Sequence, residues 1–283
     1  MSAISGAFQH RLNSISEQNE SLLCIGLDPD PTLMPIRDVF AFNREIVDAT
    51  YDQVCAYKPN LAFYEAMGIP GLKALEKTIE HIRKVAPNVL ILGDGKRGDV
   101  GNTSEAYAKA LFEVWGFDAA TVNVYGGRDA TQPFLDYGDR GVFIWCRSSN
   151  SGAGEFQGIP FGFSEKNKSR PLYEQVAIRA VAWNEAKNIG LVVGATYPAE
   201  LLKVRKLCPE MPILIPGIGS QEGSLVQAVC AGTDNSGRRA IISVSRGVLY
   251  ASKTLGFADS ARAEAIKLRL AISRILEEEG WGW

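Results

Sequence analysis

Histidine is the scarcest ionisable residue in this chain of 283 residues, which contains only two. His10 and His81 both lie in segments with a helical apolar period, away from the ends of the predicted strands. A serine–histidine–aspartate hydrolase and a histidine-rich zinc site both need imidazole at the reacting centre, so neither is expected. Any chemistry must therefore come from carboxylates, lysine, serine or backbone groups.

Cysteine is also sparse, and the five residues are scattered with no C-x-x-C pair (Cys24, Cys55, Cys146, Cys208 and Cys230). An odd, unpaired set is not typical of a disulfide framework or a zinc site. Three of the five lie inside predicted strands, where a buried free thiol is the ordinary role of cysteine. The pattern predicts a cytoplasmic protein kept in a reducing environment.

Long apolar runs and dense basic runs are absent as well. No stretch approaches the roughly 18 uninterrupted apolar residues that a membrane-spanning helix needs. Residues 1–20 lack the apolar centre of a signal peptide, and Phe8, Leu12 and Ile15 instead predict a short amphipathic helix over about 6–20. With 30 basic against 32 acidic residues and a net charge of −2, neither a membrane nor a nucleic-acid partner is expected.

Short apolar runs alternate with helical segments along the whole chain. There are eight such runs, at 22–27, 53–57, 88–93, 119–124, 141–146, 190–194, 212–215 and 239–244. Continuous runs rich in β-branched residues predict parallel strands buried on both faces. Eight units predict an α/β fold, a (β/α)₈ TIM barrel, with a doubly wound open sheet as the alternative. No composition break divides the chain, so 1–283 is expected to form a single domain.

One connection is unusually long. Residues 147–170 are rich in glycine, serine and asparagine and show no clear helical or strand period. A loop of more than about 15 residues without secondary structure is usually a lid or a binding loop. A tolerated surface insertion is the alternative.

Polar residues gather just after the predicted strands. The densest group, 94–103, separates the run 88–93 from a predicted helix at 104–112, for which Asn102 and Glu105 would form a capping box. In a barrel, residues that follow the strands meet at one mouth, where ligands bind. The set comprises Asp28, Lys58, Asp94, Lys96, Asp99, Ser148, Ser149, Gly217, Gly219, Gln221 and Arg246.

The late strands offer the chemistry of an anion site. Residues 216–221 read Pro-Gly-Ile-Gly-Ser-Gln and residues 245–247 read Ser-Arg-Gly. Glycine permits close backbone approach, amides at the start of a helix favour an anion, and arginine adds a charge-assisted fork. Loops after strands seven and eight form the usual phosphate site of a barrel. A phosphate site is predicted, with a merely tight turn as the alternative.

The early strands offer charges of alternating sign, from Asp28 through Lys58, Asp94 and Lys96 to Asp99. A lysine between two carboxylates stays protonated and can act as a proton donor. A carboxylate fixed beside it can repel a negative substrate group, by about 4 kcal/mol at about 4 Å and an effective dielectric near 20. A structural ion-pair network is the alternative.

The motifs resemble those of the orotidine 5′-phosphate decarboxylase family. The pattern Asp94-x-Lys96-x-x-Asp99 with Thr103 is similar to the signature of that family, and Lys58-Pro59-Asn60, 216–221 and 245–247 fall where its other landmarks lie. The string 96–103, with 147–150 and 193–196, resembles the longer bacterial branch. The match runs from about Leu22 to Tyr250 with the motifs in order.

The resemblance implies decarboxylation of orotidine 5′-phosphate to UMP in pyrimidine biosynthesis. Lys96 would protonate the pyrimidine C6 carbanion as carbon dioxide leaves. Asp94 and Asp99 would hold the Lys96 side chain in place. Asp99 would also crowd the substrate carboxylate. Because the matching aspartate and threonine of the family reach into the neighbouring site, Asp99 and Thr103 imply a homodimer with shared active sites.

The resemblance also implies how the nucleotide is held. Lys58 would belong to the catalytic set and, with Asp28, bind ribose hydroxyls. Ser149 would contact the pyrimidine, although the adjacent Ser148 is an alternative for the same contact. The 5′-phosphate would be bound by Gly219, Gln221 and Arg246.

No metal or organic cofactor is expected, but two other functions remain open. The first is a superfamily relative that uses Asp-x-Lys-x-x-Asp with magnesium on sugar phosphates, since carboxylates can ligate a hard cation. The second lysine, Lys58, disfavours this function, because its charge already balances that of the carboxylates and leaves less need for a metal ion. The other is a non-catalytic phosphate-binding barrel, which the complete charged set disfavours.

Overall fold

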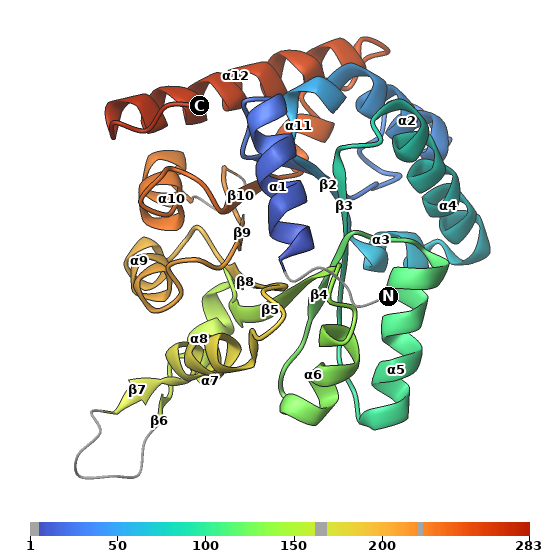
Figure 1. Ribbon diagram of the computed structural model, residues 1–283. Coiled ribbons are helices and arrows are strands. Elements are labelled where there is room, and N and C mark those ends of the chain that lie inside the picture. Colours follow the sequence, from blue (N-terminus) through green and yellow to red (C-terminus); the bar gives the residue numbers. More distant parts are fainter. Residues whose placement is uncertain (1–5, 162–168, 220–222) are drawn as a thin grey trace.

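A computed structural model describes residues 6–161, 169–219 and 223–283. Eight parallel strands close into a barrel in which each strand pairs with the next one along the chain, and the last pairs with the first (Figure 1). The predicted (β/α)₈ barrel is confirmed. Its strands are β1 (Leu23–Leu27), β2 (Ala56–Pro59), β3 (Leu90–Arg97), β4 (Ala119–Val122), β5 (Gly141–Arg147), β8 (Ile189–Val193), β9 (Ile213–Pro216) and β10 (Ala240–Val244).

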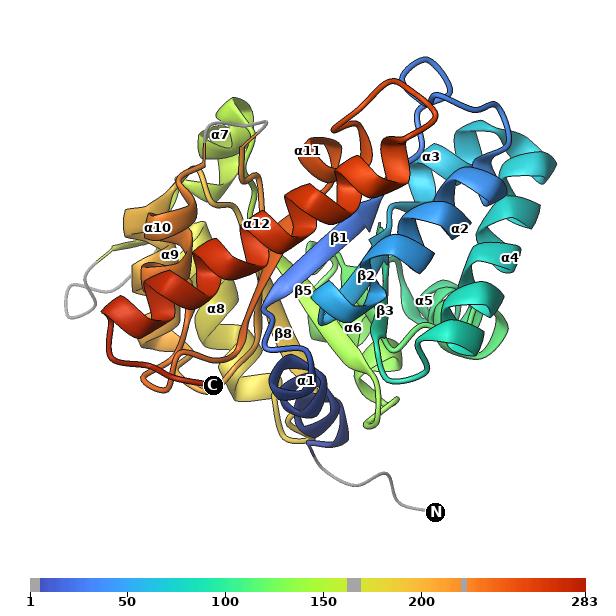
Figure 2. The ribbon, with the colours of Figure 1, turned by 90° about the horizontal axis from the view of Figure 1, so that it is seen from above.

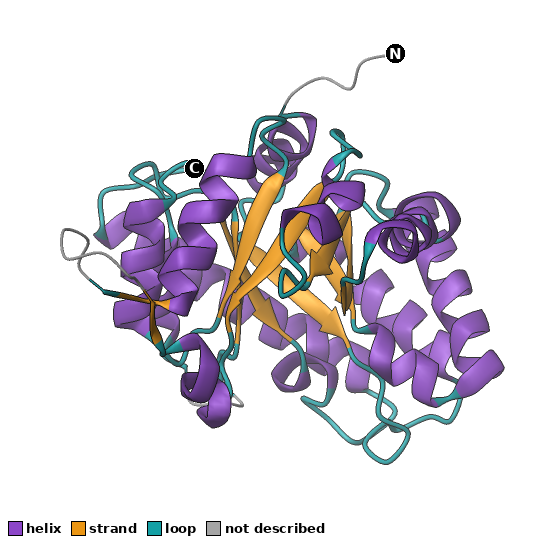
Figure 3. Ribbon diagram, turned by 90° about the horizontal axis from the view of Figure 1, so that it is seen from below, coloured by secondary structure: helices purple, strands orange, loops and turns teal. Residues whose placement is uncertain are grey.

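Helices form a layer around the strands (Figure 3). Each strand is buried because it faces the barrel interior on one side and this helical layer on the other. The outer layer consists of α2 (Val39–Thr50), α3 (Leu61–Ala66), α4 (Gly68–Val85), α5 (Gly101–Lys109), α6 (Arg128–Leu135), α8 (Leu172–Trp183), α9 (Pro198–Leu207), α10 (Leu225–Gly232), α11 (Arg246–Leu249) and α12 (Phe257–Glu278).

The two ends of the described chain both pack on the barrel. The helix expected near 6–20 is α1 (Ala7–Gln18), whose Phe8 ring lies edge-on to Phe143 with centroids 5.7 Å apart. At the other end, α12 packs against both α2 and α10, which joins the first and last units (Figure 2). The indole of Trp283 then donates to Ser273 Oγ at 3.0 Å, so the final residues fold back onto α12.

The described part of the segment after β5 contains short elements that the sequence did not predict. It contains a 3-10 turn at Ser151–Ala153, α7 (Gly154–Gln157) and the antiparallel strands β6 (Pro160–Phe161) and β7 (Arg170–Pro171), which project from the side of the barrel (Figure 1). Elements this short are stabilised by tertiary contacts rather than by an apolar period. The sequence pattern therefore could not reveal them.

The boundary between β3 and α5 differs from the prediction in two ways. β3 continues through Asp94 to Arg97, with an irregularity in its pairing with β4 between Gly93 and Arg97, and Lys96 adopts a positive φ of 46°. The predicted capping box is wrong. α5 begins at Gly101 with no side-chain cap, and the Ser104 hydroxyl instead bonds both backbone groups of Asp99, at 3.0 and 2.7 Å.

Candidate active site

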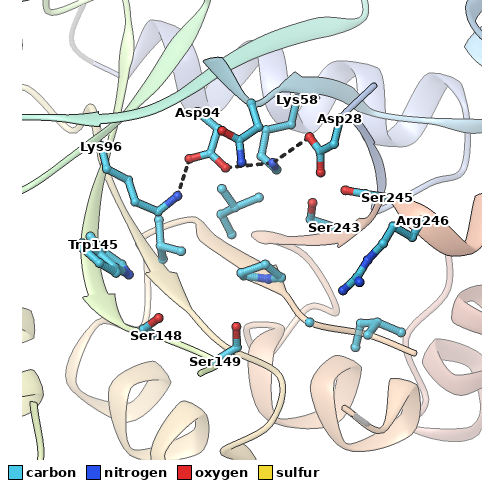
Figure 4. A pocket seen from close by; sticks show the side chains of 16 residues that line it. Asp28, Lys58, Asp94, Lys96, Trp145, Ser148, Ser149, Ser243, Ser245 and Arg246 are labelled. Atoms are coloured by element: carbon cyan, nitrogen blue, oxygen red, sulfur yellow. Dashed lines mark hydrogen bonds and ion pairs between the residues drawn. The ribbon is translucent and has the colours of Figure 1, made fainter. Parts of the chain in front are cut away.

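A pocket of about 250 Å³ opens at the carboxyl ends of the strands (Figure 4). Its polar lining comes from loops and strand ends that are far apart in the sequence, as expected for the mouth of a barrel. These residues are Asp28, Lys58, Asn60, Asp94, Lys96, Trp145, Ser148, Ser149, Ser243, Ser245 and Arg246.

Four charged side chains form a continuous array along one wall of the pocket (Figure 4). Lys58 Nζ lies 2.8 Å from Asp94 Oδ2 and 4.0 Å from Asp28 Oδ1. Lys96 Nζ lies 2.7 Å from the other oxygen, Asp94 Oδ1. Asp94 and Lys96 both come from the irregular end of β3, and their side chains meet in the pocket. The array thus alternates in sign and carries no net charge.

Burial and charge act in opposite directions on the central pair. Burial by itself would raise the pKa of the Asp94 carboxyl, but the ammonium groups of Lys58 and Lys96 outweigh it and hold that pKa far below its usual value. Burial would likewise lower the pKa of Lys58, yet the charges of Asp94 and Asp28 raise it above the ordinary lysine value. Both groups are therefore ionised at neutral pH.

Thr121, on β4, fixes the orientation of this pair. Its hydroxyl donates to Asp94 Oδ1 at 2.8 Å and accepts the backbone N–H of Lys96 at 3.0 Å. One side chain thus holds both the carboxylate and the irregular backbone that carries Lys96. Sequence reasoning missed Thr121, although a hydroxyl within the apolar run 119–124 was a usable signal.

Trp145, on β5, was also missed. Lys96 Nζ lies 5.8 Å from the centre of the indole ring, within the range of a cation–π contact. The indole therefore flanks the ammonium group at the pocket wall. The apolar run 141–146 contained no sign of which of its residues would face the pocket.

Asp28 carries an unpaired oxygen. In the part of the chain that the structure describes, its buried Oδ1 has no hydrogen-bond partner, and Lys58 Nζ at 4.0 Å is too distant to supply one. A buried oxygen of this kind is a ready acceptor for a donor on a ligand, such as a hydroxyl group.

The opposite side of the pocket has the features of an anion site. Arg246 lies there at the start of the short helix α11, across the pocket from Lys96 (Figure 4). Gly217, with φ of 101°, lines the pocket beside Ile218. Further along the chain, α10 begins at Leu225, after its Ser224 cap.

The predicted residues do not all meet at the pocket. Gly219 is exposed and lies outside the lining, and Gln221 lies outside the described residues. Asp99 is exposed, Thr103 is half-buried, and neither lines the pocket. Both Ser148 and Ser149 line the pocket, so either serine could make the predicted contact with the pyrimidine.

No group of three His, Cys, Asp or Glu side chains within 6–161, 169–219 and 223–283 could hold a metal ion. No helix among the same residues is long and apolar enough to cross a bilayer.

Known proteins resemble this chain over most of its length. Residues 21–258 match the model of the orotidine 5′-phosphate decarboxylase / HUMPS family. An orotidine 5′-phosphate decarboxylase of Thermomicrobium roseum is 50% identical over 280 residues, covering 96% of this chain and 97% of that protein. One from Dehalococcoides mccartyi is 47% identical over 267 residues, covering 94% and 97%.

Solved structures agree with this similarity. The OMP decarboxylase of Leishmania donovani superposes with a TM-score of 0.79 at 36% identity, covering 93% of this chain and 99% of that one. The UMP synthase of the same organism gives a TM-score of 0.83 at 38% identity, covering 94% of this chain and 55% of that longer chain.

Proposed function

This chain belongs to the orotidine 5′-phosphate decarboxylase / HUMPS family, and on that basis we propose how its pocket decarboxylates orotidine 5′-phosphate to UMP. The protein is a carboxy-lyase of pyrimidine biosynthesis. Relatives at 45–50% identity bear this activity in their names. The alternatives of a magnesium-dependent relative and a non-catalytic barrel are therefore set aside.

The observation that carries the mechanism is the Asp28–Lys58–Asp94–Lys96 array, which faces Arg246 across one pocket. The bond between C6 and the carboxylate breaks, its electron pair remains on C6, and carbon dioxide departs. Lys96 Nζ gives a proton to C6, which yields UMP and leaves a neutral amine that solvent protonates again. No oxidant or reductant enters this balance, and the step as written uses no metal or organic cofactor.

Asp94 keeps the proton donor in place. Its oxygens already bind two ammonium groups, so it orients Lys96 while remaining ionised. Asp99 of the partner subunit would stand beside the substrate carboxylate. Repulsion of about 4 kcal/mol at about 4 Å and an effective dielectric near 20 would then raise the energy of the bound substrate and be relieved as carbon dioxide leaves.

Binding energy remote from C6 offsets that repulsion. Arg246 would grip the 5′-phosphate with Gln221 and the backbone near Gly219, in the loops that commonly bind phosphate in barrels. The unpaired Asp28 Oδ1 and Lys58 would bind ribose hydroxyls, and Ser149 would contact the pyrimidine. These contacts lie away from the bond that breaks.

We propose a homodimer with shared sites. Asp99 and Thr103 lie outside their own chain's pocket, on a surface that also bears exposed apolar side chains, with Val100 66% and Tyr107 37% exposed. Apolar side chains gathered around a functional loop are typical of an interaction surface. A second copy covering this surface would bury them and bring Asp99 to the neighbouring site.

We propose that residues 1–283 form one domain, because α1 and α12 both pack against the barrel. We also propose that the protein lies in the cytoplasm. Among the described residues all five cysteines are free, and four of them are buried, which suits a reducing compartment.

The test is turnover of orotidine 5′-phosphate, followed by absorbance, with and without a chelator. The chelator is expected to have no effect, and a loss restored by magnesium would favour the metal-dependent alternative. Lys96→Ala should abolish turnover while UMP binding stays measurable. Lys84→Ala, an exposed lysine at the end of α4, is the matched control. Near-normal turnover by Lys96→Ala would show that Lys96 is not the proton donor.

A further inference from the structure

Arg147 is a buried charge that the mechanism above leaves unused. It immediately precedes Ser148 at the end of β5, and its side chain is only 4% exposed. Its Nε donates to Glu200 of α9, and its guanidinium stacks on the ring of Tyr197 at 3.8 Å from the centroid. An arginine paired and stacked in this way is held in one pose.

Gln157, the last residue of α7, links Arg147 to the pocket. Its Oε1 accepts the Ser148 backbone N–H at 2.8 Å and Arg147 Nη1 at 3.3 Å. The ladder between β5 and β8 is irregular between Trp145 and Arg147, and the Gly194 N–H donates to the Arg147 carbonyl at 2.8 Å. The Ser148 amide is thus paired by a side chain from the segment after β5 and not by the sheet.

The loop after β8 holds the other side of the same turn. Thr196 Oγ1 donates to the Ser149 carbonyl at 3.0 Å, and the Tyr197 hydroxyl donates to the Asn150 carbonyl at 3.2 Å. Gly194 allows this close approach, because a Cβ there would lie 2.6 Å from Ser149 Cα. The turn 148–150 is therefore held by hydrogen bonds from α7 on one side and from the loop that precedes α9 on the other.

We propose that Gln157, supported by Arg147, is a positioning residue that sets the Ser148–Ser149 turn for recognition of the pyrimidine base. This rests on the proposed function, since it assumes that the turn meets the base. It also gives α7, in the segment after β5, a role in positioning the turn. The contact of α7 with the turn makes the base subsite depend on how that segment is folded.

The experiment compares two ligands in three variants. UMP carries the base, whereas ribose 5-phosphate offers the same sugar and phosphate without it. Gln157→Leu removes the acceptor at similar size, and Gln157→Glu retains an acceptor for both donors. Glu155→Leu places the same new side chain on the exposed face of α7 and is the matched control. Dissociation constants are measured by calorimetry, and folding is checked by thermal melting.

Gln157→Leu should weaken UMP binding about tenfold, the effect of losing the hydrogen bonds that order the turn, and leave ribose 5-phosphate binding unchanged. Gln157→Glu should stay within about twofold of the native protein for both ligands, because its carboxylate accepts the same two donors. The kcat/KM for orotidine 5′-phosphate should fall in parallel with UMP affinity in Gln157→Leu.

Equal weakening of both ligands, or UMP binding by Gln157→Leu no weaker than by Glu155→Leu, would overturn the inference. Failure of Gln157→Glu to restore UMP binding would also count against it. Both dissociation constants are measured without turnover, so this test is separate from decarboxylation by the native protein. Absence of that decarboxylation would overturn the proposed function instead.

Discussion

Replacement of Asp94 by asparagine should destabilise the protein because it leaves two ammonium groups beside each other in the barrel mouth. Asp94 is buried and contacts Lys58 at 2.8 Å and Lys96 at 2.7 Å. Asparagine has nearly the same shape but no charge. Removing one partner of a buried ion pair costs about 3–5 kcal/mol, and for a chain of 283 residues that lowers Tm by roughly 5–8 °C.

The pH dependence of the effect has a defined sign. The pKa of Asp94 is lowered from 3.8, so its stabilisation is present above that value and is lost as pH falls through the folded-state pKa. The pKa of Lys58 is raised from 10.5, so its stabilisation is present below that value and is lost as pH rises through the folded-state pKa. The difference in free energy of unfolding between the native and Asp94→Asn proteins should thus be constant from about pH 5 to 9 and become smaller below about pH 4.

The assay is thermal or urea unfolding of both proteins across this pH range. Asp139→Asn makes the same chemical change at a carboxylate that is 53% exposed and paired with Arg140 at 3.4 Å. Such a surface pair contributes little to stability, so the free energy of unfolding of this control should lie within about 1 kcal/mol of that of the native protein. A loss in Asp94→Asn no larger than in Asp139→Asn, or a difference that does not shrink in acid, would refute the reasoning.

Three further predictions concern the pocket and its proposed sharing. Thr121→Val leaves Asp94 and the Lys96 amide without their common partner, so we expect a loss of about 1–3 kcal/mol in unfolding free energy together with lower kcat. Native kcat in a folded Thr121→Val protein would show that this hydroxyl does not orient the pair. Arg246→Ala should weaken UMP binding about 10- to 150-fold and leave binding of uridine, which lacks the phosphate, unchanged. Equal losses for both ligands would place Arg246 away from the phosphate. Mixing Lys96→Ala with Asp99→Ala chains should restore about a quarter of native activity, because about half of a random mixture is mixed dimers with one intact site each. Verified mixed dimers without activity would contradict shared sites.

The barrel was predictable because its signal is local. Each strand is buried on both faces, so runs such as 88–93 and 141–146 are continuously apolar, and eight of them alternate with helical periods. The eight-stranded barrel followed from that count. The strand boundaries shifted by up to three or four residues, most clearly at β2 and β3, because polar residues at a barrel mouth interrupt the apolar pattern before the ladder ends.

The charged part of the site was also predictable, since Asp28, Lys58 and Asp94 each follow an apolar run directly and Lys96 lies two residues after Asp94. Topology alone implies that such residues converge, and all four line the pocket. Which partner each would take was not predictable. Lys58, and not Lys96, lies between two carboxylates of its own chain.

The fold class, the family and the set of ionisable residues available for chemistry follow from the amino-acid sequence, because these depend on local pattern and residue type. Three contacts became visible only in the folded chain: Thr121 orients Asp94, Trp145 flanks Lys96, and Gln157 pairs with the Ser148 amide. These contacts join residues on different strands or on an irregular segment. Their geometry depends on strand register and on how that segment folds, and no spacing along the chain records either one.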